Sequence, residues 1–366
     1  MKRILYYLMA GAVLFSCAAP AGKDLPREAP SEALAAAFQT LQDSIVASFA
    51  EPLDYMKILN LHSIMVVKDG KVVLEKWFHD YTPEKPHSMF SISKTFTATA
   101  VGMAIAEGKM KLDDRVADYF PDKVLPDNPC EATVKDLLMM AGGHETDPTM
   151  KVLQIDAKNA TSRLVEGADP AAAFFSHPFV RKPGTYFWYD SLCTYILSAI
   201  VTKVTGESVL DYLTPRLFEP LGIEKPVWEA DDNGISAGGW GLCLKTEDMA
   251  KMGLLLLQNG RWGNRQLVPA DWVAEMGKAQ IDCAPANVRI EEAEAVSGVP
   301  DAENDWRYGY GFQTWQNKKE GFRADGAGGQ FILVLPEKNA VVVMTAWQPN
   351  TQRQLDFIWN ILYPAL

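Results

Sequence analysis

The sequence predicts an α/β (α+β) fold, in which an antiparallel sheet is flanked by N- and C-terminal helices and carries an inserted, mostly helical lobe. Strand patterns occur near both ends of the 366-residue chain. The middle, from about residue 112 to residue 280, has the pattern of helices joined by long loops. This order indicates one sheet built from both ends of the chain, with a cleft between the sheet and the lobe.

The first predicted elements are a helix that Ser31 starts and a β-hairpin. In the hairpin, residues 63–67 pair with residues 72–77, and the Asp69-Gly70 turn favours the reversal between them. Apolar residues recur along the helix at three- and four-residue steps and form a stripe that should pack on a flat surface: Leu34, Phe38, Leu41, Ile45 and Phe49.

The next helix, predicted from Thr95 to Glu107, is apolar nearly all round, and such a helix is buried. Ser91 and Lys94 stand at its start, one turn apart, and therefore share a face. A lysine amine can take the proton of a serine hydroxyl and make it a nucleophile. The helix N-terminus favours negative charge on that oxygen and on an attacked carbonyl. Alternatively, Ser-x-x-Lys arises by chance and Ser91 or Ser93 only caps the helix.

The remaining elements complete a sheet region, residues 31–108 and 304–366, around a mostly helical lobe, residues 109–303. The predicted helices of the lobe cover residues 134–140, 192–204, 209–217 and 247–258. Thr246 is predicted as the N-cap of the last of these helices. The predicted elements after the lobe are strands over residues 308–315, 330–335 and 340–345 and a helix over residues 351–362.

The N-terminus has the pattern of an export signal, predicted over residues 1–16, with a charged start and a short apolar core. The sequence Leu14-Phe15-Ser16-Cys17 resembles the lipobox of bacterial lipoproteins, in which the cysteine is lipidated. We therefore expect an exported lipoprotein that faces the periplasm or the cell exterior. Cys17 would anchor it to a membrane without crossing it, and residues 17–30 would be a tether. An ordinary signal with an incidental cysteine is the alternative.

Charge and composition limit the classes of partner that the protein can bind. The formal net charge is -11 and the pI is about 5.0; with no Lys/Arg-rich run, these values argue against nucleic acid. No cofactor or metal site is expected, because His144-Glu145 is followed by no second histidine at helical spacing. Four buried free thiols are the first expectation, with one disulfide as the alternative: Cys130, Cys193, Cys243 and Cys283.

From about Ser63 to its end, the chain resembles the serine β-lactamase and penicillin-binding-protein superfamily. The similarity is to the class C-like branch, which also holds esterases, D-amino-acid peptidases and 6-aminohexanoate-dimer hydrolases. Order and spacing agree over hundreds of residues, so the resemblance is more specific than any one motif. It is strongest in residues 90–97, 111–121, 134–144 and 183–191.

The resemblance implies a role for three side chains and two backbone groups. Ser91 would be the acylated nucleophile, Lys94 its proton partner, and Tyr189, the first residue of the family's Tyr-x-Asn element, a proton relay. The N–H groups of Ser91 and Ala327 would form the oxyanion hole. Without the resemblance, Tyr189 would be interpreted as a core aromatic residue.

The chain departs from the family where the substrate is held. Ser191 stands in place of the usual asparagine, and a hydroxyl offers fewer hydrogen bonds than an amide. The family's Lys-Thr-Gly or His-x-Gly element aligns with Ala324-Asp325-Gly326. Gly326 suits a backbone that a ligand approaches closely, but Ala324 lacks the cation that helps to hold a substrate carboxylate. On a regular strand, Arg323 points to the opposite face and cannot replace it.

These residues predict a serine hydrolase that cleaves a small-molecule or peptide ester or amide through an acyl-enzyme on Ser91. The alternatives are a non-hydrolysing module that senses or binds penicillin or peptidoglycan, and a true class C-type β-lactamase. An α/β-hydrolase is disfavoured because no Gly-x-Ser-x-Gly occurs. The oligomeric state stays open.

Overall fold

A computed structural model of the chain describes residues 24–50, 54–283 and 304–366. The predicted signal peptide, Cys17 and the first part of the predicted tether lie outside the described residues, as do residues 284–303 of the predicted lobe. Within the described part of the chain, no helix is both long enough and apolar enough to span a membrane.

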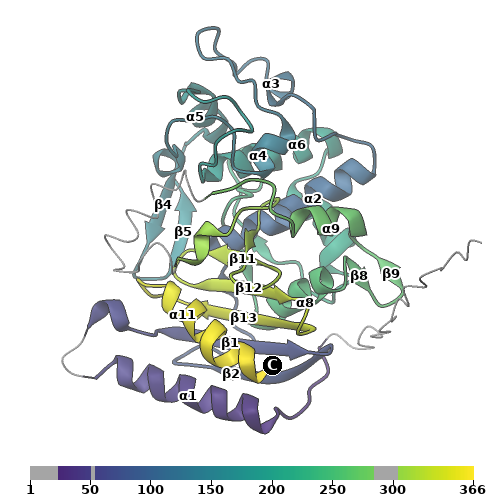
Figure 1. The fold of residues 1–366 in the computed structure, drawn as a ribbon. Helices are drawn as coiled ribbons and strands as arrows, with labels where there is room; N and C mark the ends of the chain where they lie inside the picture. The colour runs from purple at the N-terminus through teal and green to yellow at the C-terminus, as the bar shows by residue number, and fades with distance from the viewer. Residues whose placement is uncertain (1–23, 51–53, 284–303) are drawn as a thin grey trace, which may run out of the picture.

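A six-stranded antiparallel sheet joins the two ends of the chain, as the sequence predicts. Its order is β10-β11-β12-β13-β1-β2, and β1 pairs with β13 with Met65 opposite Val343 (Figure 1). The strands are β1 (Leu61–Lys68), β2 (Lys71–Trp77), β10 (Trp315–Gln316), β11 (Phe322–Gly326), β12 (Gln330–Leu335) and β13 (Ala340–Ala346).

Helices cover both faces of this sheet. Leu34 and Leu41 of α1 (Glu32–Ser48) and Leu355 of α11 (Gln352–Phe357) bury one face. The predicted start of α1 is confirmed, because the N–H of Leu34 donates to Oγ of Ser31 at 3.2 Å. The apolar stripe of α1 ends before Phe49, which is exposed. The prediction of an α/β fold with flanking helices is confirmed (Figure 1).

The opposite face of the sheet packs against α8 (Thr246–Leu257), which the sequence assigned to the lobe. Its apolar side chains share one core with Ile332 and Val343, and this burial explains why α8 belongs with the sheet. Thr246 does not cap α8 as predicted. Lys245 is the N-cap, and the buried hydroxyl of Thr246 instead hydrogen-bonds Oγ of Ser63 on β1 at 2.8 Å.

The described part of the predicted tether, residues 24–30, packs against the fold. Leu25 is buried, and the N–H of Val72 donates to the carbonyl of Pro26 at 2.8 Å. Arg27 forms ion pairs with Glu75 at 3.2 Å and Glu247 at 2.7 Å. These contacts tie residues 24–30 to β2 and α8, so this part of the predicted tether belongs to the fold.

The helix that follows Ser91 is buried as predicted. A 3₁₀ turn, η2 (Phe90–Ile92), leads into α2 (Ser93–Ala106), in which every residue from Ser93 to Ala104 is buried. Gly108, at φ +71°, follows its end. α2 lies between the sheet and the lobe and contacts α6 (Ser191–Thr205). The start of α2 therefore faces both halves of the molecule.

The lobe contains short strands as well as helices. Its other helices are α3 (Val116–Tyr119), α4 (Val134–Leu138), α5 (Pro170–Ser176), α7 (Val209–Leu213), η4 (Thr214–Phe218) and α9 (Ala270–Met276). The short strands are β4 (Leu153–Asp156), β5 (Thr161–Leu164), β6 (Val227–Trp228), β7 (Leu242–Leu244), β8 (Arg261–Trp262) and β9 (Arg265–Gln266); β3 (His87–Ser88) pairs with β7. The chain ends in η7 (Ile358–Leu362) and α12 (Tyr363–Ala365).

The strand predicted over residues 308–315 is mostly absent. Only Trp315 enters β10, because Gln313 adopts a left-handed φ of +60° and turns the chain back so that Tyr310 bridges Trp315. The buried amide of Gln313 holds this turn by donating to the carbonyls of Leu137 and Leu138 at 3.0 and 2.9 Å.

The four cysteines after the predicted signal are all free thiols in the structure. Cys130, Cys193 and Cys283 are buried, as expected, whereas Cys243 is half-buried. Burial raises the pKa of the Cys130 and Cys283 thiols to about 11, so both stay protonated and unreactive near neutral pH.

Gly102 offers a test of how tightly α2 is packed. A Cβ at this position would lie 2.2 Å from the indole ring of Trp272, whose Nε1 donates to the carbonyl of Ala98 at 3.0 Å. Although alanine favours a helix by about 1 kcal/mol over glycine, Gly102→Ala must displace a packed ring. We expect the free energy of unfolding in urea to fall by about 1–3 kcal/mol. Ala106→Ser, at the exposed end of α2, should change it by less than about 0.5 kcal/mol. An unchanged value for Gly102→Ala would contradict this packing.

Candidate active site

Ser91 and Lys94 are in contact at the start of α2. Ser91 lies in η2 and is half-buried, whereas Lys94, in the first turn of α2, is only 1% exposed. Nζ of Lys94 donates to Oγ of Ser91 at 2.8 Å. The spacing of three residues within one helical path brings a hydroxyl to an amine, which is the arrangement that nucleophilic catalysis by serine needs.

Two more oxygen atoms complete the surroundings of Lys94. Its Nζ also donates to Oγ of Ser191 at 3.0 Å and to the carbonyl of Gly239 at 2.8 Å. As an ammonium, the amine can donate to all three oxygens; in its neutral form it has two N–H groups and a lone pair, which can accept the proton of the Ser91 hydroxyl. The three acceptors come from η2, from the start of α6 and from the loop before β7. Lys94 therefore joins three separate parts of the chain.

Gly239 is a site residue that the sequence analysis missed. A Cβ there would lie 2.8 Å from the carbonyl oxygen of Ser191 and 3.6 Å from Nζ of Lys94. Only glycine lets this backbone approach both residues. The paired glycines Gly238 and Gly239 were the available signal in the sequence, but nothing there connects them with Lys94.

The residue before Ser91 is held in a strained conformation. Phe90 has a φ of +47°, which costs a residue other than glycine on the order of 1–3 kcal/mol. Its buried ring stacks on Trp347, with ring centroids 5.3 Å apart. This packing keeps the turn that presents Ser91 in place against the strain.

Tyr189 faces Lys94 across the site. Nζ of Lys94 lies 4.9 Å from the centroid of the Tyr189 ring. The ring stacks on Trp315 at 5.6 Å and meets the edge of Tyr310 at 6.2 Å. Trp315 and Tyr310 thus fix the orientation of Tyr189 and form an aromatic wall. The alternating pattern of residues 308–315 predicted a strand that contains both, and it gave no sign of this role.

A buried contact between His144 and Asp190 positions the segment that carries Tyr189 and Ser191. Nδ1 of His144 lies 2.6 Å from Oδ2 of Asp190, and both side chains are 2% exposed. Nε2 of His144 lies 3.0 Å from the carbonyl of Phe174, which can only accept, so this nitrogen carries a proton. Oδ1 of Asp190 accepts from the N–H of Leu192 at 2.8 Å and caps α6. The pair therefore fixes the residue between Tyr189 and Ser191.

The end of β11 lies against the turn that holds Ser91. A Cβ on Gly326 would stand 2.4 Å from the carbonyl oxygen of Met89, so glycine is required for this contact. Ala327 follows directly. Among the described residues, neither its N–H nor that of Ser91 has a hydrogen-bond acceptor. Both are thus donors that an oxyanion could use.

Ala324 and Arg323 lie on opposite faces of β11. Ala324 is buried in the core that α8 and α2 share with the sheet. The fully buried Arg323 donates to Oδ2 of Asp325 at 3.0 Å and to the carbonyls of Gln316 and Asp305 at 2.9 and 3.2 Å. Burial raises the pKa of Asp325 to about 6, against the lowering effect of Arg323. Arg323 is therefore committed to structural contacts.

The structure thus brings Ser91, Lys94, Tyr189 and Ser191 together around one amine and places Gly326 and Ala327 beside them. Ala324 contributes no polar atom. Cys17 lies outside the described residues, and its lipidation stays a prediction. The arrangement can form a covalent ester on Ser91 with a proton acceptor already in contact.

Comparison with known proteins identifies the family and the fold of the chain. The family model described as Beta-lactamase matches residues 61–361. The 6-aminohexanoate-dimer hydrolase of Paenarthrobacter ureafaciens is 24% identical over 301 residues, which are 79% of this chain and 74% of that protein.

Solved structures share the fold at low sequence identity. The octameric penicillin-binding protein homologue from Pyrococcus abyssi superposes with a TM-score of 0.64 at 22% identity, covering 89% of this chain and 77% of that chain. EstCE1, described as a hydrolase with promiscuous acyltransferase activity, has a TM-score of 0.67 at 16% identity, covering 91% and 100%. At these identities the likeness shows the fold alone.

The His144–Asp190 pair can be tested without knowing the reaction. Asp190→Ala leaves Nδ1 of His144 buried without its partner and removes the cap of α6, so we expect the free energy of unfolding to fall by about 1–3 kcal/mol. The double variant His144→Ala/Asp190→Ala should lose less than the sum of the two single variants, because it leaves neither side chain buried without its partner. Urea unfolding of all four proteins measures the coupling, and strictly additive losses would refute it.

Proposed function

This chain belongs to the beta-lactamase family, and we propose that it is a serine hydrolase that cleaves an ester or amide bond through an acyl-enzyme on Ser91. The observation that carries the proposal is the 2.8 Å contact between Nζ of Lys94 and Oγ of Ser91 in a site where the amine is almost fully buried. The sequence similarity to a 6-aminohexanoate-dimer hydrolase supports the reaction class.

In the first half-reaction, Oγ of Ser91 attacks the carbonyl carbon of the substrate and its proton passes to Lys94 in the neutral form. The N–H groups of Ser91 and Ala327 stabilise the tetrahedral oxyanion. The bond to the leaving alcohol or amine then breaks, and the leaving group takes up the proton by way of Lys94 and Tyr189.

In the second half-reaction, water attacks the ester on Ser91. The same groups accept its proton and return one to Oγ, which releases the carboxylic acid and restores the free serine. Ser191 keeps Nζ of Lys94 in position throughout by accepting one of its hydrogen bonds.

The main substrate is proposed to be an ester or amide rather than a β-lactam. In the family's β-lactamases, the residue aligned with Ala324 supplies a cation for the substrate carboxylate. Ala324 is buried, and Arg323 is committed to Asp325 and two carbonyls. Neither residue can hold a carboxylate beside Ser91.

The proposal is tested by treating the protein with a fluorophosphonate and with a fluorescent penicillin and weighing it intact. We expect the fluorophosphonate to add to Ser91, and small nitrophenyl esters to be turned over. Ser91→Ala should abolish the adduct, and both Ser91→Ala and Lys94→Ala should lower kcat by about 1,000-fold or more. Ser176→Ala, an exposed serine outside the site, serves as the matched control.

The other outcomes of this experiment distinguish the alternative functions. No adduct on Ser91 with either probe would sink the acyl-enzyme mechanism. A penicillin adduct that never hydrolyses would favour the non-hydrolysing sensor. Rapid turnover of β-lactams would favour a true class C-type β-lactamase.

We also propose that the protein is exported and lipidated on Cys17, with residues 1–17 as the only support. When it is expressed in a bacterium that processes lipoproteins and labelled with an alkynyl fatty acid, we expect a labelled protein in the membrane fraction. Cys17→Ser should remove the label and release the protein, whereas Cys130→Ser should not. A wild-type protein that takes up no label would refute the anchor.

A further inference from the structure

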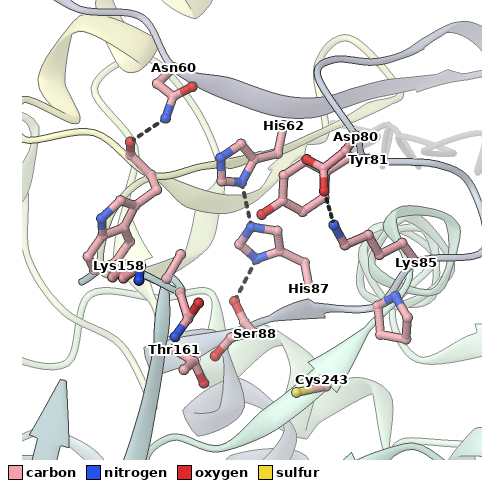
Figure 2. Close-up of a pocket in the computed structure, with 14 residues that line it drawn as sticks. Asn60, His62, Asp80, Tyr81, Lys85, His87, Ser88, Lys158, Thr161 and Cys243 are labelled. Atoms are coloured by element: carbon pink, nitrogen blue, oxygen red, sulfur yellow. Dashed lines mark hydrogen bonds and ion pairs between the residues drawn. The ribbon is translucent and has the colours of Figure 1, made fainter. Parts of the chain in front are cut away.

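A polar cavity of about 520 Å³ lies at the end of the main sheet where β1 begins and β13 ends, outside the set of residues around Lys94. Its walls come from the start of β1, from the segment that leads to β3, from β7 and from the turn between β4 and β5. In Figure 2, His62 and His87 lie in the middle of this lining, with Asn60 and Lys158 on one side and Tyr81 and Lys85 on the other. No part of the proposed reaction uses these side chains.

Hydrogen bonds fix the proton positions of the two histidines. Nδ1 of His87 lies 2.9 Å from the carbonyl of Ser88; a carbonyl can only accept, so this nitrogen carries the proton. Nε2 of a neutral His87 must then accept from Nδ1 of His62, 2.7 Å away. Nε2 of His62 is left with a lone pair, and it has no hydrogen-bond partner among the described residues.

The surroundings keep His62 neutral. Both imidazoles are 5% exposed, and the His62 ring stacks on Tyr81 with centroids 4.0 Å apart. Burial, with help from His87, His79 and Lys85 and against Asp80, lowers the pKa of His62 to about 3. At neutral pH, its Nε2 is therefore a fixed hydrogen-bond acceptor inside a cavity.

The charges that line the cavity leave an excess of one positive charge. Nζ of Lys85 pairs with Asp80 at 2.7 Å, whereas the ammonium of Lys158 has no acidic partner among the described residues. Asp156 in the same turn offsets this charge and accepts from the backbone N–H of Lys158 at 3.1 Å, but the ammonium of Lys158 itself can still meet an anion.

The cavity is close to Ser91. Ser88 lines it and precedes Ser91 by three residues, which span at most about 11 Å of chain. Trp347 also lines it and stacks on Phe90, the neighbour of Ser91. These two contacts place the cavity beside the turn that holds Ser91.

We propose that this cavity is a subsite for the carboxylate end of the substrate, with the carboxylate beside Lys158 and an N–H or O–H donor of the substrate bonded to Nε2 of His62. The inference rests on the proposed function, and it names a substrate class: an ester or amide with an acidic end. It also provides the cation that Ala324 lacks, at a different place in the fold.

Binding is tested first on Ser91→Ala, which cannot turn over a ligand, by calorimetry with N-acetylglycine and its homologues with one and two added methylenes. At least one of these should bind saturably. Two analogues of that ligand should bind about tenfold more weakly: the primary amide, which lacks the charge, and the N-methyl analogue, which lacks the N–H donor.

Lys158→Gln should weaken the binding of the acid about tenfold and leave the binding of the amide unchanged. Lys109→Gln, which changes an exposed lysine just beyond the end of α2, should change neither. His62→Phe, which keeps a ring against Tyr81, should remove the preference for the N–H.

Kinetics form the second test. The KM of mono-4-nitrophenyl glutarate should be lower than the KM of its methyl ester. Lys158→Gln should raise the KM of the acid about tenfold relative to the KM of the methyl ester. Equal binding of acid and amide to Ser91→Ala, or no saturable binding of any acid, would overturn the subsite. These outcomes are separate from those at Ser91. A protein that does not react with the fluorophosphonate can still bind N-acetylglycine. A protein that reacts with the fluorophosphonate but binds no acid would overturn only the subsite.

Discussion

The buried amine of Lys94 is the interaction on which the rest of the site depends. A buried ammonium is costly unless its N–H groups are all hydrogen-bonded. Here the oxygens of Ser91, Ser191 and Gly239 meet that requirement. Because these oxygens come from a turn beside the sheet, a lobe helix and a loop before β7, satisfying one nitrogen holds the two halves of the molecule in register. The same contact that stabilises the amine sets it against the hydroxyl of Ser91.

Packed and hydrogen-bonded contacts hold the segments around this amine in place. The strained turn at Phe90 is held by Trp347, and the segment of Tyr189 and Ser191 is held by the His144–Asp190 pair. Gly326 and Gly239 let two backbones approach where any side chain would collide. Such a site is preorganised for charge that develops at one place, which is the general requirement for electrostatic stabilisation of a transition state. The attacking groups and the proposed carboxylate subsite lie at the same end of the sheet, but they are built from different residues.

The sequence predicted the parts of the site that depend on local spacing or family order. Ser91 and Lys94 were found because three residues of helix bring them to one face. Tyr189 and Ser191 were found through the resemblance, whereas Gly239 was not, because its role depends on an approach to Lys94 from 145 residues away. The aromatic wall was missed for a similar reason: alternating residues 308–315 have a strand pattern, and only the contacts of Gln313 with distant carbonyls turn that segment back on itself.

By itself, the sequence determined the fold class, the buried helix and the pair at its start, because apolar periodicity and turn residues act over a few positions. Tertiary structure alone decided that α8 packs on the sheet and that residues 24–30 join it, since both follow from burial against distant strands. It also decided the carboxylate-binding character that we propose for the cavity at the start of β1. His62, His87 and Lys158 are far apart in the chain, and only folding brings an unpartnered nitrogen and a spare positive charge into one space.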